Sequence, residues 1–154
     1  MITVAQYFMG RDASHSTELT PEIRRNAALT VQVVNELLSR AAAEGVQPGI
    51  NPQTNSNVSS GWRPPGINEK TANAAKGSTH LQALACDVRD TRGRELARWC
   101  LANLDVLAEL GLWMEDPRWT PTWVHLQAVP PGSGKRVYRP SSKPPLTPPL
   151  PGQS

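Results

Sequence analysis

A long amphipathic segment at residues 21–44 constrains the fold of this chain more than any other feature. Apolar residues recur along it at three- and four-residue spacing, which gathers them on one face of a helix. Thr20 is placed to cap the N-terminus, Pro21 suits the first helical position and Gly45 follows the last turn. The segment therefore predicts a scaffold helix with one buried face, which the rest of the chain must cover.

The remaining sequence predicts short strands and helices in one domain. Strands are expected near residues 58–63, 84–88, 112–115 and 122–127, and helices near residues 68–75 and 92–110, the second capped by Asp90 or Thr91. A length of 154 residues suits one ordinary domain. We expect an α+β fold with a small antiparallel sheet flanked by helices. The domain spans residues 1–139, and a Pro-rich tail at residues 140–154 is expected to be extended or disordered.

Composition narrows the classes of function. The net charge is +3, but the basic residues are scattered and form no stripe, so nucleic-acid binding is not favoured. Cys86 and Cys100 fit neither a disulfide framework nor a metal knuckle, and we expect buried free thiols. No apolar run reaches the length of a membrane span and no signal peptide is recognisable, so we expect a protein made in the cytoplasm without membrane insertion. Trp113, Trp119 and Trp123 pack in a core or line a cleft.

Two of the three histidines, together with one aspartate, form a candidate metal site. Asp87 lies inside the apolar run at residues 84–88, where an unpaired carboxylate would cost several kcal/mol, so it needs a cation, a metal or strong donors. His80 and His125 can supply two further ligands, which leaves a fourth position open as in catalytic zinc sites. Considered singly, His80 also fits a surface loop, Asp87 an ion pair, and His125 a core residue bonded to a backbone carbonyl.

Three motifs in the second half of the chain resemble one family. They are Ser60-Gly61-Trp62-Arg63, Gly77-Ser78-Thr79-His80 with Asp87, and Trp123-Val124-His125. In order and separation they resemble the signatures of the zinc D-alanyl-D-alanine carboxypeptidases and the related phage endolysin peptidases. The matching region, residues 58–127, spans nearly half the chain. The resemblance implies a hedgehog/DD-peptidase-like fold.

The resemblance also implies an activity and its residues. His80, Asp87 and His125 would hold Zn²⁺, and the enzyme would cleave a bond in the stem peptides or cross-bridges of bacterial peptidoglycan, as a carboxypeptidase or an endopeptidase. Arg63 would stabilise the anion formed during attack or bind a substrate carboxylate; its alternative is a structural ion pair. Ser78 would bind substrate or cap the turn before His80. Trp123 is a further substrate-binding candidate, from the third motif.

A phage or prophage lysis endopeptidase is the expected biological context. We expect a monomer that reaches the cell wall after release, through a separate pore-forming partner. The composition also permits a different class of function, a soluble adaptor that uses the Pro-rich tail as a polyproline ligand.

The chain departs from the family pattern at two positions. The family often has glycine three residues after the first histidine, where this chain has Ala83, so we expect a negative φ there. Many members carry an acid three residues before the last histidine, where this chain has Thr122. We therefore predict Glu115 as the general base and Asp116 as the second choice; the alternative is that both are solvated loop acids. Without a base, the chain would be a zinc-containing, non-catalytic cell-wall-binding or virion-associated protein.

Overall fold

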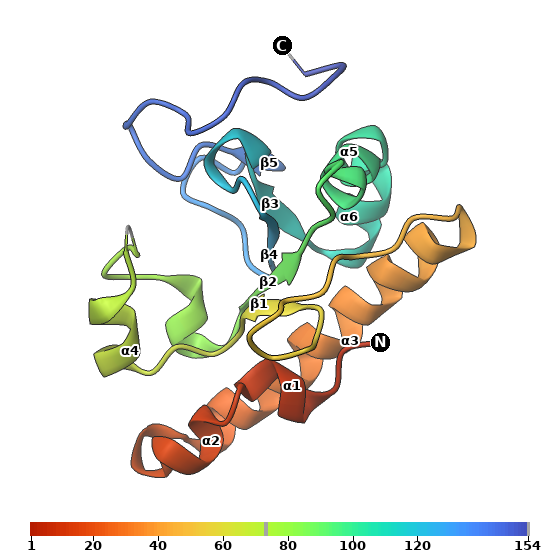
Figure 1. Ribbon diagram of the computed structural model, residues 1–154. Coiled ribbons are helices and arrows are strands. Elements are labelled where there is room, and N and C mark those ends of the chain that lie inside the picture. Colours follow the sequence, from red (N-terminus) through yellow and green to blue (C-terminus); the bar gives the residue numbers. More distant parts are fainter. Residues whose placement is uncertain (73, 154) are drawn as a thin grey trace.

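The computed structural model describes residues 1–72 and 74–153 (Figure 1). Residue 73, in the predicted helix 68–75, and residue 154, at the end of the tail, lie outside the described part. The helices are α1 (Val4–Phe8), α2 (Arg11–Ser14), η1 (Ser16–Glu18), α3 (Pro21–Ala43), α4 (Pro65–Lys70), η2 (Thr79–Gln82), α5 (Glu95–Ala102), α6 (Leu104–Leu110) and η3 (Pro117–Trp119). The strands are β1 (Val58–Ser60), β2 (Ala85–Arg89), β3 (Trp113–Glu115), β4 (Trp123–Gln127) and β5 (Val137–Tyr138).

The scaffold helix α3 matches its prediction. The Thr20 hydroxyl accepts a hydrogen bond from the backbone N–H of Ile23 at 3.1 Å, and Gly45 follows the end of the helix with φ +81°. Its buried face contacts α1, α6 and β2, so α3 packs against elements from both halves of the chain (Figure 1). The buried Thr30 hydroxyl also donates to the carbonyl oxygen of Ala83 at 2.8 Å, which fastens the helix to the turn before β2.

The strands form one five-stranded sheet in the order β1-β2-β4-β3-β5. The first three neighbouring pairs are antiparallel, but β3 and β5 are parallel. The α+β class is confirmed, whereas the prediction of an antiparallel sheet is wrong at this edge. After β4 the chain reverses through residues 128–136, so β5 runs opposite to β4 and therefore alongside β3 in the same direction.

One face of the sheet belongs to the core. Buried apolar side chains on this face pack with α3 and α5 in one hydrophobic cluster, and those from the strands are Val58, Cys86, Val88, Met114, Val124 and Leu126. Cys86 and Cys100 are buried free thiols, as predicted. Because side chains alternate along a strand, the residues between these apolar ones point to the opposite face. That face carries the polar site.

The predicted helix at residues 92–110 is two helices. Asn103, with φ −130°, separates α5 from α6, and its side-chain amide donates to the Trp99 carbonyl oxygen at 2.8 Å. This local bond competes with helix continuation. The predicted N-cap, Asp90 or Thr91, is wrong, because α5 begins at Glu95 and its N-cap is Arg94. The Asp90 carboxylate still accepts from the backbone N–H groups of Leu96 and Ala97 in the first turn.

Two further details differ from expectation. The short helix predicted at residues 68–75 begins earlier, as α4, because Pro65 fits its first turn. Ala83 adopts φ +57°, so the expected negative φ is wrong. The turn after η2 requires the left-handed backbone conformation, which glycine adopts more easily than alanine. This conformation destabilises the fold by roughly 1 kcal/mol at the buried Ala83.

The tail runs without helix or strand from residue 140 to residue 153 and lies over η3. The Arg118 carbonyl oxygen accepts from the backbone N–H groups of Leu146 and Thr147 at 2.9 and 3.1 Å. The Gln153 amide donates to Asp116 at 2.9 Å. In the described ranges no helix is long and apolar enough to cross a membrane.

Candidate metal centre

The turn that carries His80 fixes the orientation of its ring. Ser78 caps η2 by accepting a hydrogen bond from the backbone N–H of His80 at 3.3 Å. The His80 Nδ1 atom lies 2.7 Å from the carbonyl oxygen of Gly61. A carbonyl only accepts, so Nδ1 carries the proton and Nε2 keeps its lone pair. Burial lowers the pKa of His80, which favours this neutral ring.

Gly61 is the residue that brings this carbonyl oxygen to His80. The chain passes so close to α1 that a Cβ atom at position 61 would lie 1.9 Å from the carbonyl oxygen of Tyr7. Only glycine fits there without a backbone shift. This steric conflict with Tyr7 explains why the Ser-Gly-Trp-Arg motif has glycine at position 61.

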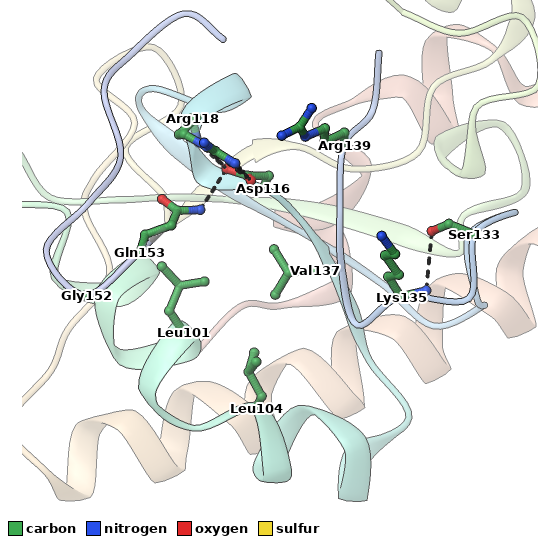
Figure 2. Close-up of a pocket in the computed structure, with 10 residues that line it drawn as sticks. All are labelled: Leu101, Leu104, Asp116, Arg118, Ser133, Lys135, Val137, Arg139, Gly152 and Gln153. Atoms are coloured by element: carbon green, nitrogen blue, oxygen red, sulfur yellow. Dashed lines mark hydrogen bonds and ion pairs between the residues drawn. The ribbon is translucent and has the colours of Figure 1, made fainter. Parts of the chain in front are cut away.

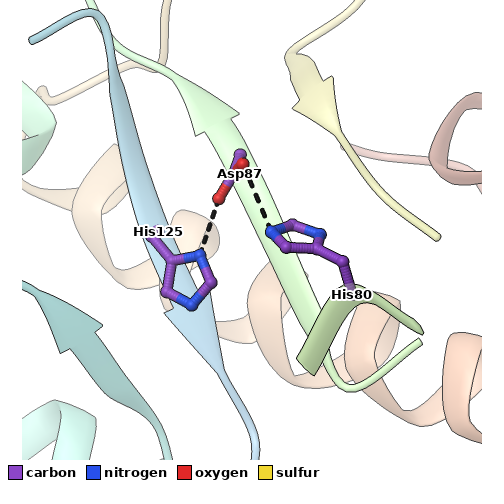
Figure 3. A group of neighbouring side chains, drawn as sticks. All are labelled: His80, Asp87 and His125. Carbon is purple, nitrogen blue, oxygen red and sulfur yellow. Dashed lines mark hydrogen bonds and ion pairs between the residues drawn. The ribbon is translucent and has the colours of Figure 1, made fainter. Parts of the chain in front are cut away.

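Asp87 and His125 are direct partners in β2 and β4. Asp87 Oδ1 lies 2.8 Å from His125 Nδ1, and Oδ2 lies 3.3 Å from His80 Nε2 (Figure 3). The second contact is close but lacks hydrogen-bond geometry, which leaves His80 Nε2 buried without a hydrogen-bond partner in the described ranges. Burial alone would raise the pKa of Asp87, but the two imidazoles lower it well below its ordinary range.

His80, Asp87 and His125 form a group that can hold a metal ion. All three are buried, and one ligand atom from each lies within 4.8 Å of the other two. The unpartnered lone pair of His80 Nε2, aimed at a carboxylate, is what a metal ligand needs before the ion binds. Two imidazoles and one carboxylate suit a first-row transition metal such as zinc. His15 bonds to Ser14 and belongs to a different part of the chain.

Asp87 and His125 belong to one row of paired residues that runs across the strands of the sheet. Ser60 pairs with Asp87, Asp87 with His125, and Glu115 with Tyr138. Continuing the β3–β4 register by one residue puts Glu115 opposite His125. The row therefore places one residue from each of the five strands side by side.

The antiparallel pairing of β3 with β4 brings Glu115, the predicted general base, close to His125. Its Oε1 atom is 3.9 Å from His125 Nε2, and burial raises the pKa of its carboxyl group. Burial opposes a charge on His125 as well, but Glu115 and Asp87 outweigh it and raise the pKa of His125 to about 9. Glu115 is thus a half-buried acid beside the candidate metal centre.

Asp116 lies elsewhere. Its carboxylate accepts from the backbone and guanidinium of Arg118 and from Gln153. Although burial would raise the pKa of Asp116, these bonds lower it below its ordinary value. The same carboxylate lines a cavity of about 520 Å³ together with Val137 and Lys135 (Figure 2). Because Val137 and Tyr138 point to opposite sides of β5, this cavity and the metal candidate lie on different faces.

Arg63 is a buried cation next to the metal candidate. One guanidinium nitrogen donates to the Ser78 hydroxyl at 3.2 Å, and Nε is buried without a partner in the described part of the chain. None of the ion pairs formed between described residues includes Arg63, so the predicted alternative of a structural ion pair is absent there. Burial lowers the pKa of Arg63, and the nearby charges of Asp87 and Glu115 oppose that shift. The capping role predicted for Ser78 is confirmed.

Trp113, Trp119 and Trp123 are half-buried rather than central to the core, unlike the buried Trp62 and Trp99. Trp123 begins β4 and, two residues before His125, shares its face of the strand. Arg136 lies over Trp113, and Arg118 and Trp119 make a similar contact. Trp113, which pairs with Gln127 in β3 and β4, lies on the same polar face.

Gln127 is a neighbour of the metal candidate that sequence reasoning missed. Its amide oxygen lies 2.9 Å from His125 Nε2 and also faces the hydroxyl groups of Tyr138 and Thr79. The period of two in β4 could have revealed it, because residues 125 and 127 must share one face. Tyr138 had no comparable signal, since it lies in a two-residue strand after a Pro- and Gly-rich loop.

Comparison with known proteins does not assign the chain to a family. No protein-family model matches it, and neither curated proteins nor solved structures give a significant match. Function must therefore be argued from the motifs and the geometry of the site.

Proposed function

We propose that this chain is a zinc-dependent peptidase that cleaves stem peptides or cross-bridges of bacterial peptidoglycan, as a relative of the D-alanyl-D-alanine carboxypeptidases and phage endolysin peptidases. The observation that supports it best is the convergence of His80, Asp87 and His125, three ligands suggested by motif order, in one buried group. The α+β architecture is compatible with a hedgehog/DD-peptidase-like fold. A phage or prophage lysis endopeptidase, acting as a monomer after release through a pore-forming partner, is the proposed context.

Zinc is the proposed ion because two imidazoles and one carboxylate leave room for an exchangeable fourth ligand. Bound in such a site, zinc supplies Lewis-acid polarisation of a peptide carbonyl and activation of water. Within the protein, His80 contributes a neutral imidazole held by Gly61, and Asp87 contributes an ionised carboxylate. Their burial keeps both side chains in fixed orientations.

Glu115 is proposed as the general base. Proton transfer needs a carboxyl group near the reacting atoms with a pKa shifted toward neutrality, and burial raises the pKa of Glu115. Its place opposite His125 supports this role. Asp116 is a poorer candidate, because Arg118 and Gln153 already bind its carboxylate.

Arg63 is proposed to bind the anionic part of the substrate or of the transition state. A buried guanidinium with a single side-chain hydrogen bond retains free donors, and a carboxylate or an oxyanion would satisfy them. Both a C-terminal D-alanine and the D-glutamate of the stem peptide offer a carboxylate near the scissile bond. The chain is therefore proposed to act on an anionic peptide, while the choice between carboxypeptidase and endopeptidase rests on the products. Trp123, on the same face, is proposed to contact the substrate.

A second candidate function keeps the metal without catalysis. Thr122, where many family members carry the acid, is exposed and precedes β4. A zinc-containing protein that binds the cell wall or belongs to a virion would have no need of a base. Turnover by the wild-type protein separates the two candidates.

The test is digestion of purified peptidoglycan with zinc-loaded and with chelator-stripped protein, followed by mass spectrometry of the new termini. We expect cleavage only with zinc, and the termini identify the bond. His125→Ala should bind much less zinc, whereas His15→Ala, the matched control, should bind one equivalent. Zinc binding without any cleavage would favour the non-catalytic candidate, and absence of zinc binding would remove both.

A further inference from the structure

The amide of Gln127 is held in one orientation. The side chain is almost completely buried, and its Nε2 atom donates to the carbonyl oxygen of Val129 at 2.8 Å. Since a carbonyl only accepts, the amide nitrogen must lie on that side and the amide oxygen on the other. The Tyr138 hydroxyl, at 2.5 Å, and the Thr79 hydroxyl, at 3.5 Å, can both donate to this oxygen.

This orientation determines the proton on one nitrogen of His125. The amide oxygen of Gln127 lies 2.9 Å from His125 Nε2 and can only accept, so Nε2 must carry a proton. Glu115 Oε1, at 3.9 Å from the same atom, is beyond hydrogen-bond distance. In the neutral ring the lone pair then belongs to Nδ1, which faces Asp87 at 2.8 Å.

We propose that Gln127 is a positioning residue that keeps His125 protonated at Nε2 and thereby makes Nδ1 the metal-binding atom, with Tyr138 and Thr79 holding the amide in place. This inference rests on the proposed metal site. In His80 the two ring nitrogens have the opposite roles. Nδ1 donates to the Gly61 carbonyl oxygen, and Nε2 faces Asp87. Each imidazole thus has a fixed acceptor on the nitrogen that turns away from the carboxylate.

The wild-type protein alone gives the first test. With Zn²⁺ bound and the histidines labelled with ¹⁵N, the Nε2 atom of His125 should show a bound proton that exchanges slowly, and Nδ1 should show the shift of a metal ligand. The opposite assignment, with the metal on Nε2, would overturn the inference even if zinc binds tightly.

Two substitutions at one position give the second test. Gln127→Met keeps the length of the side chain but removes the acceptor, so its zinc affinity, measured by competition with a chelator, should fall about 10- to 100-fold. Gln127→Glu keeps an acceptor oxygen and should restore the affinity to within about tenfold of wild type. Gln47→Met, at an exposed position, is the matched control and should leave affinity unchanged.

The outcomes separate this inference from the proposed function. Tight zinc binding by wild type and equal affinity of Gln127→Met would contradict the role of Gln127 and leave the metal site intact. No zinc binding by wild type would remove the metal site and the inference together. If Gln127→Met does not fold, the ¹⁵N assignment in wild type still decides.

Discussion

Replacing Gly61 by alanine should damage the fold and the candidate metal site together. The added methyl group would lie 1.9 Å from the Tyr7 carbonyl oxygen and 2.9 Å from the Tyr7 carbonyl carbon and ring. Carbon and oxygen atoms in contact need more than 3 Å, so the backbone of residue 61 or of α1 must move. The Gly61 carbonyl would then leave its 2.7 Å contact with His80 Nδ1.

The expected loss follows from these two effects. Inserting a methyl group into a well-packed region costs about 1–3 kcal/mol, and losing one buried hydrogen bond costs about 1 kcal/mol more. We therefore expect Gly61→Ala to lower the free energy of unfolding by about 2–4 kcal/mol, which for a domain of this size lowers the Tm by roughly 5–15 °C. Urea and thermal unfolding of the metal-free protein measure both quantities.

A matched control exists in the same segment. Gly66 lies in α4, is exposed and has nothing within 4 Å of a Cβ atom, so Gly66→Ala should be neutral or stabilise the protein by up to about 1 kcal/mol. Zinc affinity should fall for Gly61→Ala and stay unchanged for Gly66→Ala. The steric reasoning is refuted if Gly61→Ala unfolds within about 0.5 kcal/mol of wild type, a shift typical of neutral surface substitutions.

Three further predictions concern the polar residues and the tail. Glu115→Gln should keep one bound zinc but reduce kcat by about 10²- to 10⁴-fold, measured on peptidoglycan fragments, and full turnover would rule out Glu115 as the base. Asp116→Asn should destabilise the protein by roughly 1 kcal/mol near neutral pH, because the carboxylate bonded to Arg118 has a lowered pKa. That contribution is present above the ordinary pKa of an aspartate and disappears as the pH falls through the lowered one, so urea unfolding of the two proteins should converge in acid; a gap that persists would contradict it. Deleting residues 140–154 should lower stability, because the bonds to Arg118 and Asp116 are lost, and leave peptidoglycan cleavage in place; loss of partner binding with unchanged stability would instead indicate a polyproline ligand.

Local patterns predicted the elements whose causes lie within a few residues. The apolar stripe and the Thr20 cap gave the place of α3, and the run around Asp87 gave β2. The role predicted for Glu115 depended on antiparallel pairing of β3 with β4, and the structure shows that pairing.

Other features depended on contacts that no local pattern contains. The break at Asn103 comes from a side-chain bond to Trp99 inside an otherwise helical pattern. The left-handed Ala83 is held by contacts from elsewhere in the fold, including the hydroxyl of Thr30. Strand β5 is two residues long and exists because its backbone pairs with β3, far back in the chain.

In the candidate site, too, some residues were predicted from local patterns and others depend on distant contacts. His80, Asp87 and His125 were suggested by the scarcity of histidine, by the apolar run around Asp87 and by the three motifs. The second acceptor of each imidazole was not foreseen, since Gly61 acts through its backbone and Gln127 through an orientation fixed by Val129. Sequence patterns identify groups that bind a metal more readily than the groups that orient them.

The register of β2 with β4 has a consequence for how the protein folds. Asp87 and His125 are neighbours across two strands that are separated in sequence by α5, α6 and β3, so the ligand set forms only after this long-range pairing. An ion that binds the paired strands but not the unfolded chain cannot nucleate folding. It would act afterwards, and at a thousandfold excess over its Kd it would add about 4 kcal/mol to stability. Bound metal would then indicate that β2 and β4, at the centre of the sheet, have already paired.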